Sequence, residues 1–162
     1  MAPIDFAVLA PVPREHLDDG QDVARRTGYV CFGSHKWELF RELDRRRDGE
    51  RVPVLIYASH NEELAEWGYV VAWKGNYVGS VDDTMGKLEE ERGGHRPRST
   101  DKYRHKGDSA TGWPVFWKVS DLTQLTDNER RELRDFQSYR TGRDKENSAP
   151  RGPEIIVRPM WI

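Results

Sequence analysis

The strongest candidate for an anion-binding segment is a basic run between residues 92 and 106, which reads RGGHRPRSTDKYRHK. Six lysines and arginines minus one acid, Asp101, give it a local charge of +5, whereas the whole chain carries −2. Basic side chains that pair with phosphates release condensed counterions, and Tyr103 within the run can stack on a base. We assign the phosphate contacts to Arg96, Arg98, Lys102 and Arg104. The alternative is a solvated loop that balances acidic neighbours.

Aromatic and small polar residues also gather at the ends of neighbouring β-prone runs. A pocket for a nucleic-acid base needs flat rings against the base and hydroxyl or imidazole groups along its polar edge. The residues that meet this description are Ser34, His35, Tyr57, Ser59, Trp73 and Trp113. The alternative is that strand alternation turns most of these rings, and those of Trp67 and Trp117, into the core.

The sharper chemical motifs are missing from the sequence. The five histidines form no His-x-x-x-His pair, and Cys31 is the only cysteine. The chain has no glycine-rich phosphate loop and no Gly-x-Ser-x-Gly elbow. We therefore expect no metal and no cofactor, and we assign no catalytic residue. Whether the protein is an enzyme stays open, with a binding role favoured.

Five apolar, β-prone runs predict strands, and these strands would position the candidate pocket residues. They are Ile4–Ala10, Tyr29–Phe32, Val52–Ala58, Trp113–Ser120 and Glu154–Arg158. Continuous apolar character predicts that the strand at 29–32 is buried on both faces. Pro53 predicts that its strand lies at an edge or begins there. A Gly75-Asn76 pair between Trp67–Trp73 and Tyr77–Val81 predicts a two-residue β-hairpin.

Helical signals are fewer. Trp37, Phe40 and Leu43 form one apolar stripe on a helix that Ser34 would cap and that Asp48-Gly49 would end near Arg47. A capping box at Thr126–Glu129 predicts a second helix over residues 127–137, with Leu133 and Phe136 facing the core.

The remaining segments have weaker patterns. Residues 14–26 are expected to form a helical turn or a surface loop, and residues 82–91 a weak helix. Residues 92–112 and 140–152 are expected to be polar loops.

Length and composition place these elements in a single domain over residues 1–162. A single cysteine, the absence of an apolar membrane span and an N-terminus without a basic, apolar leader predict a cytoplasmic protein that does not enter a membrane. Six tryptophans are more than a core of this size needs, so some are expected on a binding surface.

The order of elements resembles the PUA-like superfamily, which includes the EVE, ASCH, YTH and SRA domains. The resemblance covers roughly residues 28–136. It rests on Val30–Ser34, on the strand Val54–Ser59 that ends in Tyr57-Ala58-Ser59, and on Trp113–Val119. The sequence lacks the tryptophan with which many EVE domains begin. The resemblance implies an α+β fold, a small distorted β-barrel flanked by helices, with a pocket for a modified or flipped base.

The function that this resemblance implies is the reading of a modified base in nucleic acid. We expect methylated or otherwise modified cytosine in DNA, with DNA favoured over RNA. The alternatives are an ASCH-type hydrolase that acts on a modified nucleoside, an RNA-binding module, or an interaction module that binds no nucleic acid. The oligomeric state is left open.

Overall fold

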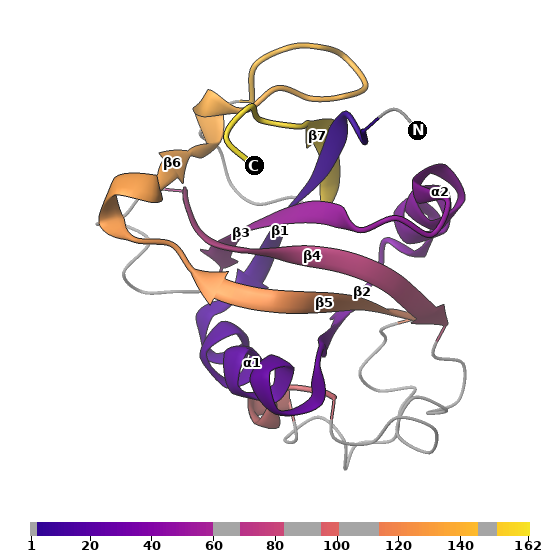
Figure 1. Ribbon diagram of the computed structural model, residues 1–162, viewed down its shortest axis with the longest axis vertical. Helices are drawn as coiled ribbons and strands as arrows, with labels where there is room; N and C mark the ends of the chain where they lie inside the picture. Colours follow the sequence, from indigo (N-terminus) through magenta and orange to yellow (C-terminus); the bar gives the residue numbers. More distant parts are fainter. Residues whose placement is uncertain (1–2, 60–68, 83–94, 101–113, 146–151) are drawn as a thin grey trace.

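A computed structural model describes residues 3–59, 69–82, 95–100, 114–145 and 152–162 (Figure 1). The strands are β1 (Phe6–Pro13), β2 (Val30–Ser34), β3 (Val52–Ser59), β4 (Val70–Asp82), β5 (Val115–Gln124), β6 (Arg131–Glu132) and β7 (Glu154–Val157). The α-helices are α1 (Arg14–Thr27) and α2 (Trp37–Arg47). Three short 3-10 helices are η1 (Arg98–Thr100), η2 (Asp127–Glu129) and η3 (Leu133–Asp135). This mixture of helices with one largely antiparallel sheet confirms the α+β class.

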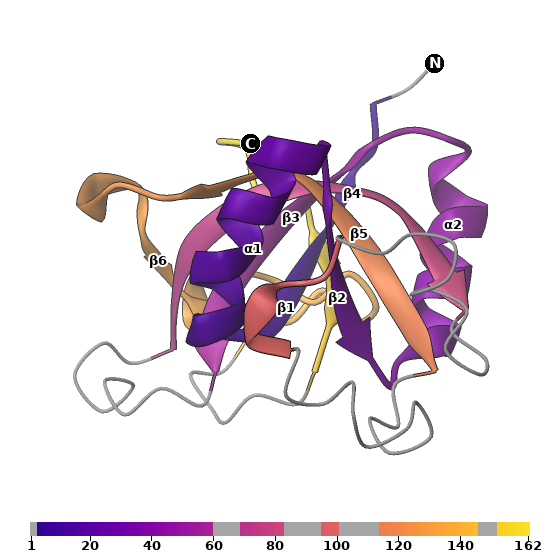
Figure 2. The ribbon, with the colours of Figure 1, turned by 90° about the horizontal axis from the view of Figure 1, so that it is seen from below.

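The seven strands form one mixed sheet in the order β2-β5-β4-β3-β1-β7, and β6 pairs with β4. Strands β1 and β3 are parallel, and every other pair is antiparallel. In the described part of the chain no ladder joins β2 to β7, so the sheet is not closed. It is strongly curled, because α1 packs against β1 and β3 and also against β2 and β5 (Figure 2).

Alternating side chains of the sheet fill two apolar layers, as the two-residue period of a strand requires. Val8 and Val54 face the concave side, where they pack with Leu17 of α1 and Phe40 of α2. The neighbouring residues of β1 and β3 face the convex side, which is covered by the segment after β5. Strand β2 contributes to both sides through Val30 and Cys31, which confirms that it is buried on both faces.

Prolines in the two parallel strands lie where the strand is paired on one side only. Strand β1 pairs with β7 only from Phe6 to Leu9, so Pro11 and Pro13 fall beyond that ladder. This explains why β1 extends past the predicted end at Ala10. Pro53 precedes the ladder with β1, which begins at Val54, so it lies at the start of its strand as predicted.

The predicted hairpin at Gly75-Asn76 is wrong, because β4 continues through both residues as one 13-residue strand. A Cβ on Gly75 would lie 2.6 Å from Val119 Cγ1 and 3.0 Å from the Ser120 carbonyl oxygen. The β4–β5 ladder also shifts register between Lys74 and Asn76. Glycine is therefore needed here for close approach of two backbones, and not for a turn.

Both helices differ from the sequence prediction. Residues 14–27 form a full helix whose buried face includes Leu17, Gly20 and Val23, although the pattern indicated only a turn or a loop. Helix α2 buries Phe40 and Leu43 as predicted, but Trp37 is 39% exposed. Ser34 Oγ accepts a hydrogen bond from the Lys36 amide (3.1 Å), one residue before the helix, so Ser34 closes a turn and does not cap α2.

The capping box at Thr126–Glu129 is present, but the helix predicted after it is wrong. The box closes only η2, and the chain then extends into β6 and turns through η3. Leu133 and Phe136 are nevertheless buried in the convex layer, as predicted. The predicted weak helix at 82–91 and most of the basic run lie outside the described residues.

Candidate functional site

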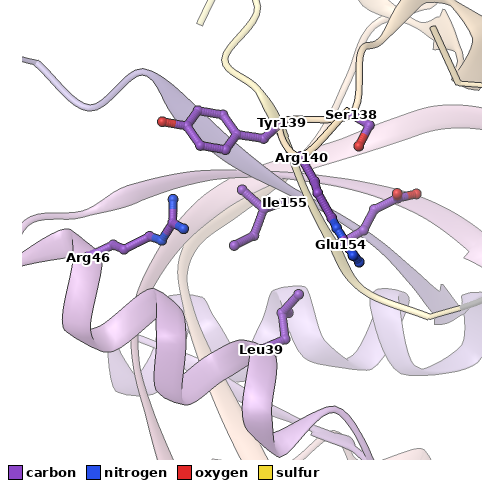
Figure 3. Close-up of a pocket in the computed structure, with 7 residues that line it drawn as sticks. All are labelled: Leu39, Arg46, Ser138, Tyr139, Arg140, Glu154 and Ile155. Carbon is purple, nitrogen blue, oxygen red and sulfur yellow. The ribbon is translucent and has the colours of Figure 1, made fainter. Parts of the chain in front are cut away.

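A cavity of 630 Å³ lies between α2 and the paired segments around residues 138–140 and 154–155 (Figure 3). It is lined by Leu39, Arg46, Ser138, Tyr139, Arg140, Glu154 and Ile155. Leu39 and Ile155 lie in its middle, with Arg46 and Tyr139 on one side and the polar side chains of the remaining residues on the other. Apolar surface and opposite charges therefore meet in one hollow.

Helix α2 supplies Leu39 and Arg46, which are seven residues apart and so project from the same face. Arg46 Nε lies 2.6 Å from Glu42 Oε1, one turn earlier. The guanidinium carbon of Arg46 is 5.7 Å from the centre of the Tyr139 ring. Hydrogen bonds from Arg45 and then Arg46 lower the pKa of Glu42 to about 2. Glu42 is thus a carboxylate that steadies Arg46 at the rim.

Helix α2 is itself fixed to the sheet by Asp44. Its carboxylate accepts hydrogen bonds from Tyr77 Oη (3.0 Å) and Ser80 Oγ (2.7 Å) of β4, and from Arg47 Nε (2.9 Å). Burial raises the pKa of Tyr77, which keeps its hydroxyl protonated as a donor. This network holds the α2 wall of the cavity in place.

The opposite wall is held by backbone pairing at the outer edge of β7. The Tyr139 amide donates to the Ile155 carbonyl (3.2 Å), and the Val157 amide donates to the Gln137 carbonyl (2.9 Å). Arg140 then lies in a turn closed by a hydrogen bond from the Gly142 amide to the Ser138 carbonyl (2.8 Å). Gly142 has a φ of +68°, which favours glycine at this position.

The polar groups of the cavity suit a ligand with an anionic part and a flat part. Guanidinium groups at Arg46 and Arg140 match the geometry of carboxylate and phosphate oxygens. Tyr139 offers a ring whose hydroxyl is held by Asp5 at 3.2 Å. Glu154 is paired with Lys145 through its Oε2 atom at 2.7 Å. A volume of 630 Å³ lies within the range of small-molecule sites, about 300–1,000 Å³.

Of the residues predicted to form a base pocket, the five that the structure describes do not converge. The three antiparallel ladders from β3 through β4 and β5 to β2 make β2 run opposite to β3. Ser34 and His35 therefore lie at one end of the sheet, where β2 leads into α2, and Ser59 lies at the other end (Figure 1). Ser34 and Ser59 are buried, whereas His35 is exposed.

Two of the predicted pocket aromatics belong to the core. Tyr57 lies in the convex layer, where burial raises its pKa, and Trp73 is 4% exposed in the concave layer. The two rings are thus on opposite faces of the sheet. Trp117 is also buried in the concave layer, in agreement with the core alternative. Trp67 and Trp113 lie outside the described residues.

The basic run is described only from 95 to 100, and Lys102 and Arg104 fall outside this segment. Arg98 is exposed, as a phosphate contact requires. Arg96 is 4% exposed, with its guanidinium carbon 5.0 Å from the centre of the Phe116 ring. A phosphate contact from Arg96 would need this segment to move away from β5.

Contacts with β2 and α1 fix the segment 95–100. The Cys31 amide donates to the His95 carbonyl (2.7 Å), and the His95 ring stacks on Tyr29 with ring centres 4.1 Å apart. His16 Nδ1 lies 2.6 Å from Ser99 Oγ, a distance that a nucleophile and its base would show. Asp19, however, accepts from the Ser99 amide (2.7 Å) and does not orient the imidazole, so these contacts anchor η1 to α1.

The sequence prediction missed the cavity. Arg46 and Leu39 share a helix face, a spacing that is visible in the sequence. Their partners lie about a hundred residues later, at 138–140 in a segment without periodicity and at 154–155 in a predicted strand. The pairing of β1 with both β3 and β7 contributes to bringing these parts together.

Two further searches concern the described residues alone. They contain no group of three or more histidine, cysteine, aspartate or glutamate side chains placed to hold a metal ion. Neither described helix has the length and apolar character needed to cross a bilayer.

Comparisons of the chain with protein-family models, with curated proteins and with solved structures found no match.

Proposed function

We propose that this protein binds nucleic acid and holds one unstacked base in the cavity between α2 and β7. The observation that carries the proposal is the meeting of two guanidinium groups, a tyrosine ring and an apolar floor in one hollow of 630 Å³. Guanidinium groups pair with phosphate oxygens, and an aromatic ring stacks on the face of any base. A nucleotide unit has both parts, which is why it fits these groups better than a purely apolar ligand.

The arrangement assigns a separate role to each wall. The Tyr139 ring, with Leu39 and Ile155 beside it, would contact the base. Arg46 and Arg140 would contact the phosphates on either side of it. Arg98 is exposed on the opposite flank of the sheet, near β2, and would add a contact to a longer strand.

The finer part of the proposal is that the chain is a PUA-like domain and that it recognises modified cytosine in DNA. The resemblance of residues 28–136 supports it, and the described sheet is curled but not closed into the barrel that the resemblance implies. In this arrangement the modified base would occupy the cavity, because the pocket residues expected from the resemblance are spread over both ends and both faces of the sheet.

A binding titration at two salt concentrations tests the proposal. Short DNA and RNA oligonucleotides, single-stranded and duplex, with plain or methylated cytosine, would be compared by fluorescence anisotropy. The double variant Arg46→Ala/Arg140→Ala should bind at least tenfold more weakly. Its plot of log affinity against log salt should be flatter by about 0.7 for each lost phosphate contact on a single strand.

Arg45→Ala is the matched control. Arg45 is on the same helix and carries the same charge, and it pairs with the same Glu42, but it does not line the cavity. It should leave the affinity within about twofold, since exposed charges outside a site contribute little. No binding to any strand, or an equal loss in Arg45→Ala and the double variant, would overturn the proposal. A preference for methylated over plain cytosine would support its finer part, and equal binding would remove it.

A further inference from the structure

Glu154 places a carboxylate in a cavity that otherwise presents two arginines. It is the first residue of β7 and is aligned with Leu9 of β1, so its backbone is held by the sheet. Its side chain is 33% exposed, and Lys145 Nζ lies 2.7 Å from its Oε2 atom. A phosphate would be repelled by this group. A carboxylate in such a cavity therefore needs a hydrogen-bond donor on the part of the ligand that approaches it.

We propose that Glu154 selects a base that carries an exocyclic amino group, such as cytosine, over uracil or thymine. This inference rests on the proposed function and names the base that the cavity accepts. An ionised carboxylate can only accept hydrogen bonds. Lys145 is bound to Oε2, and the described residues place no donor on Oε1.

Cytosine and uracil present opposite groups to such an acceptor. Cytosine carries an amino donor at N4, a group that Glu and Asp accept from in known complexes. Uracil and thymine carry a carbonyl oxygen at the same ring position, and its lone pairs would face Oε1. Their own donor, N3–H, lies at the neighbouring ring position, so these bases would have to shift in the cavity to reach the carboxylate. The discrimination thus comes from one hydrogen bond gained against one repulsive contact.

Lys145 makes this discrimination sharper by fixing the carboxylate. The pair joins a residue just after the turn 138–143 to the first residue of β7, so it also links the two segments that form this wall. With Oε2 held by the ammonium group, rotation of the carboxylate away from a carbonyl would break this ion pair. Glu154 therefore acts as a fixed acceptor.

Short single-stranded homopolymers of deoxycytidine and deoxyuridine form the pair of probes, because their bases differ only at ring position 4 and at the neighbouring N3, which accepts a hydrogen bond in cytosine and donates one in uracil. The wild-type protein should bind the deoxycytidine strand about tenfold more tightly, which corresponds to about 1.4 kcal/mol. Glu154→Gln should bring the affinity ratio close to one, because the amide can turn its NH₂ group toward the uracil oxygen. Both strands should bind at least as tightly as before, since a negative charge near the phosphates has been removed.

Glu38→Gln is the control, because Glu38 is exposed on α2 and does not line the cavity. It removes the same charge and should keep the tenfold ratio. If Glu154→Gln does not fold, Glu154→Asp keeps the charge and withdraws the carboxylate by one methylene group, and it should reduce the ratio.

The outcomes separate the two proposals. Absence of binding to both strands and to every oligonucleotide of the titration above would overturn the proposed function. Binding of both strands that Arg46→Ala/Arg140→Ala weakens, without a preference for deoxycytidine, would overturn only the role of Glu154. A tenfold preference that is undiminished in a folded Glu154→Gln or Glu154→Asp variant would also overturn it.

Discussion

Replacement of Gly75 by alanine tests the uninterrupted path of β4, the main departure from the sequence prediction. The added Cβ would lie 2.6 Å from Val119 Cγ1, whereas ordinary contacts begin at 3.4 Å, so one side must move by about 0.8 Å (3.4 − 2.6). Val119 is fully buried, and its β-branched side chain has few rotamers into which it can move. The second contact, 3.0 Å, is to a backbone oxygen of β5.

The expected cost follows from two opposing effects. Overpacking of a close-packed core costs about 1–3 kcal/mol. Loss of glycine's freedom in the unfolded chain offsets about 0.4–1 kcal/mol of this. Gly75→Ala should therefore lower the free energy of unfolding by about 0–2.6 kcal/mol, with a central value of about 1.3 kcal/mol that corresponds to a Tm lower by about 3–5 °C for a chain of this size.

Urea unfolding followed by tryptophan fluorescence would measure this change, with an unchanged m value expected. A double-mutant cycle with Val119→Ala identifies the cause, since removal of Cγ1 should relieve most of the cost of Gly75→Ala. In a hairpin, glycine would be required for its backbone angles, and Val119→Ala would give no relief. Strictly additive effects of the two substitutions would therefore refute a close approach of β5 at Gly75.

Four further substitutions test contacts of helix α2 and of the segment 95–100. Asp44→Asn should lower the free energy of unfolding by about 1–3 kcal/mol, because the amide cannot accept from Tyr77, Ser80 and Arg47 together, and urea unfolding would measure it. The Glu42 carboxylate has its pKa lowered from 4.5 to about 2, so the stability it contributes is complete above about pH 4.5 and is lost as pH falls through about 2. The difference in Tm between wild type and Glu42→Gln should follow this course, and a constant difference from pH 6 down to pH 2 would contradict it. Arg96→Ala should destabilise the protein in thermal melting, because Arg96 is buried over Phe116, whereas Arg98→Ala should change stability by less than about 0.5 kcal/mol.

Patterns that depend on local chemistry predicted the elements well. The apolar runs at 4–10, 29–32, 52–58 and 154–158 all correspond to strands, because alternation and β-branched residues are set within each run. The predictions that are wrong concern segments whose conformation is determined by contacts with residues far away in the sequence. Gly75 has the local character of a turn, and only the approach of β5 shows that it serves a long strand. The capping box at Thr126 forms as its residues dictate, but the apolar convex layer holds the following residues in an extended path.

The candidate site shows the same division. The basic and aromatic residues are evident in the sequence. Spacing along the chain does not show on which face, or at which end, of the sheet each of them lies. Tyr57 and Trp73 are on opposite faces, and Ser34 and Ser59 are at opposite ends. Leu39 and Tyr139 line one cavity because β1 pairs with both β3 and β7, an arrangement that no local pattern encodes.

Mapping of backbone amide shifts by NMR during titration with a short single-stranded oligonucleotide tests the central claim most directly. If the cavity holds a base, the largest shifts should fall on Leu39, on 138–140 and on Glu154 and Ile155, and they should disappear for Arg46→Ala/Arg140→Ala at the same concentrations. Shifts confined to Ser34 and His35, to Ser59 or to the segment 95–100 would show that the nucleic acid binds elsewhere. Absence of shifts at any concentration would contradict nucleic-acid binding itself.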